Sequence, residues 1–132
     1  MRSVAKLIVA VLLLPTSIVA NPDQKEQRVR FERGRTSAIL KGAVTNSEQE
    51  NYHAYRLRVG KGQRLTVHLA SPVKDARFLL TLPDDSTAEN DSGEAELKDW
   101  EGPIPASGDI VITIYHRGST ARMPYTLEVT VR

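Results

Sequence analysis

The chain has 132 residues, with 18 basic and 16 acidic side chains, one Trp, four Tyr, two Phe and no Cys. This length fits one modest domain and excludes a two-domain enzyme. The absence of Cys excludes disulfides, zinc–thiolate sites, iron–sulfur clusters and cysteine nucleophiles.

Residues 1–20 have the pattern of a cleaved signal peptide. Arg2 and Lys6 flank the start of an apolar run that reaches Leu14, and Ala20 precedes Asn21. The pattern predicts export to the periplasm, with secretion as the alternative, and no membrane attachment after cleavage. Without Arg2 and Lys6 the 18 basic residues fall to 16, which equals the number of acidic residues. A neutral mature chain removes the main support for nucleic-acid binding, so no nucleic acid partner is expected.

Period-two alternation dominates the rest of the chain. Residues 21–27 carry no apolar side chain that packs, and we expect a flexible N-terminus there. The Gly60-Lys61-Gly62-Gln63 turn between two alternating segments is typical of a β-hairpin. Seven segments share this alternation or a weaker form of it: 28–32, 37–44, 54–59, 64–69, 76–82, 110–114 and 125–132. The pattern predicts an all-β fold, a single antiparallel β-sandwich of about seven to eight strands over residues 28–132.

Charge is unevenly distributed along this neutral chain. Residues 84–101 contain eight acidic side chains and one Lys, whereas residues 25–41 contain six basic and two acidic side chains. We interpret both segments as solvated loops or strand faces, with a dipolar surface that steers a charged partner as the alternative. Calcium binding at 84–94 is a further alternative, but the acids do not follow the EF-hand pattern, and no metal site is predicted.

No motif for catalysis is found. The sequence has no Gly-x-Ser-x-Gly elbow, no phosphate-binding loop and no His-Glu-x-x-His, so neither an enzyme nor a cofactor is expected. His53, His68 and His116 form no pair at metal-ligand spacing, and His68 is expected at the surface. Trp100 is expected to anchor the core or a sheet edge, with a stacking platform for a sugar or partner as the alternative.

Two parts of the chain resemble known families. The run Val29–Ala38, then Gly42, Tyr55–Leu57 and Gly60–Val67, resembles the periplasmic inhibitors of goose-type lysozyme. A second set also resembles the bacterial pre-peptidase C-terminal domains, which are exported β-sandwich modules: Phe78, Leu80, Pro83, Ile104–Asp109 and Tyr125–Leu127. The likeness extends over residues 28–131.

The resemblance implies a non-enzymatic lysozyme inhibitor that inserts loops into the carboxylate-lined cleft of its target, with the goose-type enzyme favoured. Arginine pairs with a carboxylate through two parallel hydrogen bonds. The loop 115–124 contains no acid, and we expect Arg117 and Arg122 to contact the enzyme. His116 is a further donor when protonated, with a solvated loop histidine as the alternative.

Ser107, Gly108 and Asp109 are expected in a neighbouring partner-binding loop. With Ile110 they resemble the Ser-Gly-x-Tyr motif of several lysozyme-inhibitor families, except that Ile replaces Tyr. An ordinary turn before a strand is the alternative reading of these residues. The alternative function for the whole chain is a non-inhibitory exported module that binds cell-wall glycan or protein, and the sequence leaves the oligomeric state open.

Overall fold

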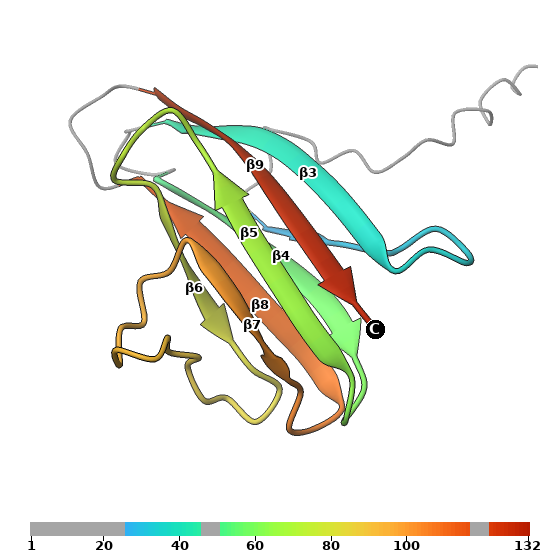
Figure 1. Ribbon diagram of the computed structural model, residues 1–132. Helices are drawn as coiled ribbons and strands as arrows, with labels where there is room; N and C mark the ends of the chain where they lie inside the picture. The colour runs from blue at the N-terminus through green and yellow to red at the C-terminus, as the bar shows by residue number, and fades with distance from the viewer. Residues whose placement is uncertain (1–25, 46–50, 117–121) are drawn as a thin grey trace, which may run out of the picture.

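The computed structural model describes residues 26–45, 51–116 and 122–132, and in it the chain forms two packed β-sheets (Figure 1). One sheet has the strand order β2-β4-β8-β6 and the other the order β3-β9-β5-β7. The strands are β2 (Glu26–Arg28), β3 (Ser37–Thr45), β4 (Tyr52–Val59), β5 (Arg64–Ala70), β6 (Arg77–Thr81), β7 (Asp99–Pro103), β8 (Gly108–Tyr115) and β9 (Arg122–Val131). The predicted all-β sandwich is confirmed.

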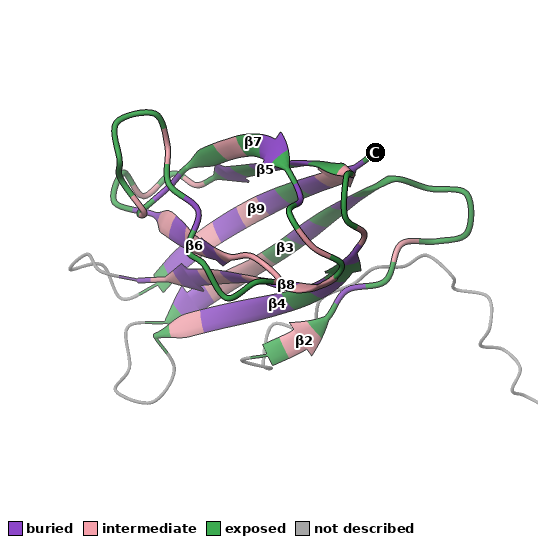
Figure 2. Ribbon diagram, turned by 90° about the horizontal axis from the view of Figure 1, so that it is seen from below, coloured by how far each residue is buried: buried purple, intermediate pink, exposed green. Residues whose placement is uncertain are grey.

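The core lies between the two sheets, and Figure 2 shows buried positions on the strands of both layers. On β5, buried Leu65, Val67 and Leu69 alternate with exposed residues, as the period-two pattern predicts. The inner faces of β6 and β8 contribute Phe78 and Ile112, which are almost fully buried. Within the described residues no helix is long and apolar enough to cross a membrane.

Two strands differ from the sequence prediction. β2 begins at Glu26, inside the segment expected to be flexible, and pairs with β4 in parallel rather than antiparallel register. The pairing depends on backbone hydrogen bonds, so it leaves no pattern of apolar residues in the sequence. Next to the strand, the Val29 N–H donates to the Arg56 carbonyl at 2.8 Å. The expected strand at 28–32 is wrong beyond Arg28. The signal peptide and residues 21–25 lie outside the described residues.

β7 was not predicted as a strand. Its residues Asp99–Pro103 pair with β5 at the edge of the sheet, and Trp100 and Gly102 are its less exposed positions. An edge strand with one large apolar side chain does not produce an alternating apolar pattern. Because Trp100 packs against the core from this edge, its predicted role as an anchor is confirmed.

A buried polar cluster connects the two sheets. Tyr125 on β9 shares its hydroxyl with two residues of β4: His53, whose Nδ1 lies 2.7 Å away, and the hydroxyl of Tyr55. All three side chains are buried, and the rings of His53 and Tyr55 meet the Tyr125 ring edge-on. These hydrogen bonds satisfy polar groups that would otherwise be costly to bury, and they fix the position of the Tyr125 ring.

We expect Gly42→Ala to lower the free energy of unfolding by about 1–3 kcal/mol, the usual cost of overpacking. Gly42 lies opposite Tyr125 in the β3–β9 pair, and a Cβ there would come within 2.7 Å of the Tyr125 hydroxyl oxygen and 2.9 Å of Cζ. The hydrogen bonds to His53 and Tyr55 hold the Tyr125 hydroxyl in this position. Urea unfolding measures the effect, and Gly60→Ala is the control, because its Cβ would meet nothing closer than Gln63 Oε1 at 3.4 Å. Equal stabilities for the two variants would contradict this account.

Candidate functional site

Arg122 is the first residue of β9, and β9 begins at one end of the sandwich, at the upper left in Figure 1. Arg122 is exposed and pairs with Thr45, the last residue of β3. In the other sheet, Tyr115 at the end of β8 pairs with Tyr52 and Arg77, the first residues of β4 and β6. We call these five residues the Arg122 end. Strand pairing brings together two parts of the chain in one sheet and three in the other, and both sets lie at the same end of the sandwich (Figure 1).

Tyr52, Arg77 and Tyr115 were not singled out in the sequence. All three are half-buried and precede or follow core residues by one position, which places them on the outward side of their strands. Tyr and Arg are the residue types most enriched at interface hot spots. Alternation in the sequence is enough to predict that these side chains point outward. That they lie side by side depends on the pairing of β4, β8 and β6.

The predicted site residues near Arg122 have different outcomes. Arg117 lies outside the described residues. His116 is buried, with 5% of its surface exposed, and its backbone N–H donates to the Asn51 carbonyl at 2.9 Å. The expected solvated loop histidine is therefore wrong, and so is the expectation that its ring donates to a partner, because the imidazole is covered by the protein itself.

Ser107, Gly108 and Asp109 lie at the opposite end of the sandwich. They stand at the start of β8, and Tyr115 at its other end is seven residues from Gly108, or roughly 23 Å along an extended strand. Ser107 Oγ accepts a hydrogen bond from the Lys61 N–H at 2.9 Å, which ties it to the turn between β4 and β5. The expectation that this loop neighbours the arginine-bearing loop is wrong, because β8 spans the full sheet between them.

Asp109 is held by an internal ion pair. Its two carboxylate oxygens accept hydrogen bonds from Arg28 Nη1 and Nη2 at 3.2 and 2.6 Å. These hydrogen bonds lower the pKa of Asp109, desolvation opposes them, and the positive charges of Arg28, Arg58 and Arg56 lower it further. The carboxylate is thus ionised and already engaged, which favours the ordinary structural turn over a contact residue at this position.

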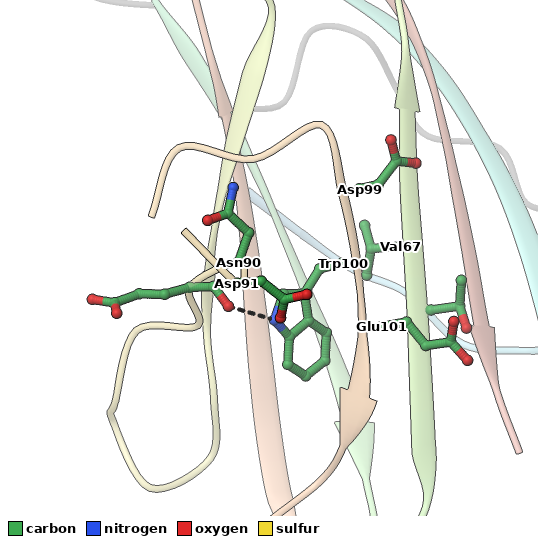
Figure 3. Close-up of a pocket in the computed structure, with 8 residues that line it drawn as sticks. Val67, Asn90, Asp91, Asp99, Trp100 and Glu101 are labelled. Carbon is green, nitrogen blue, oxygen red and sulfur yellow. Dashed lines mark hydrogen bonds between the residues drawn. The ribbon is translucent and has the colours of Figure 1, made fainter. Parts of the chain in front are cut away.

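A pocket of about 360 Å³ lies beside Trp100 at the β7 edge (Figure 3). Acidic side chains surround it: Asp99 and Glu101 from β7, and Glu89 and Asp91 from the preceding loop. Asp99 pairs with His68, whose predicted surface position is confirmed. In the part of the chain that the structure describes, no three His, Asp or Glu side chains are placed to hold a metal ion.

No protein-family model and no curated protein matches the sequence. Solved structures show a similar β-sandwich fold, and one of them is a pre-peptidase C-terminal domain. That domain of a Bacillus anthracis collagenase covers 86% of this chain and 100% of its own at 12% identity, with a TM-score of 0.52. This likeness shows the fold alone.

The chain is also similar in structure to PliG, a periplasmic inhibitor of g-type lysozyme. The Aeromonas hydrophila protein has a TM-score of 0.65 and 28% identity, over 82% of this chain and 96% of that chain. The Salmonella Typhimurium protein has a TM-score of 0.62 and 19% identity, over 82% and 98% of the two chains. The resemblance stated from the sequence, to goose-type lysozyme inhibitors and to the broader sandwich class, is confirmed.

Proposed function

We propose that this protein is a periplasmic inhibitor of lysozyme and that its target is the goose-type enzyme. The observation that supports this is the similarity to the Aeromonas hydrophila inhibitor across 82% of the chain, at 28% identity. That protein is a periplasmic inhibitor of g-type lysozyme. The proposed role is to bind an enzyme without catalysing a reaction, and the predicted signal peptide at residues 1–20 supplies the route to the periplasm.

The Arg122 end is the proposed contact surface. A lysozyme cleft carries catalytic carboxylates, and the planar fork of an arginine pairs with a carboxylate through two hydrogen bonds. Arg122 is exposed at this end, and Arg117 precedes it by five positions in the sequence. Tyr52 and Tyr115 would add rigid amphipathic surface beside the guanidinium group. Ser107–Asp109, at the opposite end, are left out of the same contact.

We expect the purified protein to inhibit goose-type lysozyme and to leave the chicken-type and invertebrate-type enzymes active. The measurement is lysis of permeabilised bacterial cells by each enzyme as the protein is titrated in, with circular dichroism to confirm the fold. Inhibition of a different lysozyme class would support the inhibitor function but show that the target is not the goose-type enzyme. Full activity of all three enzymes in the presence of folded protein would overturn the proposal and favour the non-inhibitory binding module.

A further inference from the structure

We propose that the pocket beside Trp100 is a binding site for an uncharged saccharide, separate from the lysozyme contact. The pocket lies at the β7 edge, next to Thr66 of β5. Thr66 pairs with Thr130 of β9, which is eight residues, or roughly 26 Å, from Arg122 along the strand. The site therefore does not share residues with the Arg122 end, and the two proposals stand independently.

The indole of Trp100 is fixed at two points. Its Nε1–H donates to the Glu89 carbonyl at 3.3 Å, the bond drawn as a dashed line in Figure 3. Its far edge lies over Gly102, where a Cβ would come within 2.7 Å of Cη2 and 2.8 Å of Cζ2. Gly102 thus provides the space that the ring occupies on β7. A ring that is held before binding loses little conformational freedom when a ligand stacks on it.

The half-buried indole contributes aromatic surface to the pocket instead of being fully covered by the core. One face of a pyranose ring presents C–H bonds, and these pack favourably against an aromatic ring. A volume of about 360 Å³ is at the lower end for small-molecule sites, which suits about one or two sugar rings.

Carboxylates supply hydrogen-bond acceptors for sugar hydroxyls. Asp99 is paired with His68, and Glu101 accepts from Arg64 Nε at 2.9 Å. Glu89 and Asp91 form no ion pair with the described residues. An ionised carboxylate accepts hydrogen bonds and donates none, so these two side chains match a ligand rich in hydroxyl donors.

The loop that carries Glu89 and Asp91 is closed by its own hydrogen bonds. Asn90 Oδ1 accepts from the backbone N–H groups of Ser92 and Glu94, each at 2.9 Å. The acceptors therefore sit on a fixed turn facing the Trp100 strand. The negative charge around the pocket repels acidic sugars, so the ligand class is a neutral saccharide.

Tryptophan emission tests the proposal directly, because Trp100 is the only Trp in the chain. The probes are tetramers of N-acetylglucosamine, glucose and mannose, with a galacturonate tetramer as the acidic control. At least one neutral probe should give a saturable change in emission, and the acidic probe should bind at least about tenfold more weakly, or about 1.4 kcal/mol. No saturable change with any neutral probe, or equal binding of the acidic one, would overturn the proposal.

Variants assign the binding to the pocket, with calorimetry as the readout. Trp100→Ala should abolish binding. Because Trp100 also anchors β7, Trp100→Phe is the second variant, which keeps a smaller ring and should weaken binding. Replacing Glu89 and Asp91 by Gln and Asn should weaken it as well, whereas the same amide changes at Asp84 and Asp85, outside the pocket on the same loop, should not. Undiminished binding by folded Trp100→Ala would refute the site. Lysozyme inhibition should be the same in all four variants.

Discussion

Replacing both Arg117 and Arg122 by Ala will weaken inhibition of goose-type lysozyme about a hundredfold. Removing one side of charged pairs at an interface typically costs roughly 2–5 kcal/mol, because the carboxylates of the partner are left desolvated without their cations. Arg122 is the exposed first residue of β9, so its side chain can be shortened without opening the core. The inhibition constant from the lysis assay is the measurement.

The matched control replaces Arg33 and Arg35 by Ala. Both are exposed in the turn between β2 and β3, which precedes Ser37 at the far end of the sandwich from Arg122. This control also removes two positive charges. The inhibition constant should change by less than about twofold if the contact lies at the Arg122 end. A third variant, Asp109→Asn, should also inhibit normally. A folded Arg117/Arg122 variant with unchanged inhibition would move the contact elsewhere, and a loss confined to Asp109→Asn would place it at the Ser107 end.

The free energy of unfolding will fall steeply above about pH 10 because of Tyr55 and Tyr125. Burial raises the pKa of both hydroxyls; the hydrogen bond with Tyr125 partly opposes the shift at Tyr55, and the proximity of Tyr55 adds to the shift at Tyr125. In the unfolded chain both lose their protons near pH 10, whereas in the folded protein they lose them at a higher pH. The stabilisation is therefore complete below that pH and is lost above it, by up to about 1.4 kcal/mol per pH unit for each Tyr.

Urea unfolding followed by Trp100 emission between about pH 8 and pH 11 measures this dependence. Tyrosinate absorbance of the two buried residues should appear together with unfolding. Tyr125→Phe should reduce the slope, since one titrating group is removed. Tyr52→Phe is the comparison variant, because Tyr52 is half-buried and is not one of the three residues of the cluster. A free energy of unfolding that stays level across this range would show that the hydroxyls ionise in the folded state.

Alternation predicted most strands because each has one face against the core. It also carried information about the histidines that the sequence interpretation did not use. His53 continues the inward phase of Tyr55, Leu57 and Val59, and the structure buries it. His116 likewise follows Ile114 by two positions and is buried. The resemblance to the goose-type inhibitors placed His116 in the loop 115–124, although the period-two phase puts its side chain on the inner side.

Non-local pairing explains what the sequence could not predict. The Arg122 end exists because β4 lies beside β8 and β3 beside β9, and no local pattern fixes these neighbours. The resemblance to inhibitor motifs led to the expectation that Ser107 and Arg122 belong to neighbouring loops, but the length of β8 separates them. The pocket at Trp100 combines an edge strand without alternation and the polar segment 89–94, so composition showed only an acidic segment.

The position of β9 also sets the order in which the molecule can be completed. The last strand of the chain is an inner strand of its sheet, paired with β3 on one side and β5 on the other. Until residues 122–131 have been synthesised, β3 has no neighbour in that sheet, so half of the sandwich cannot close. A growing chain without β9 would thus lack the strand that joins β3 to β5. This suits the proposed export, because a chain that crosses the membrane as an extended thread can complete this sheet only after β9 has arrived.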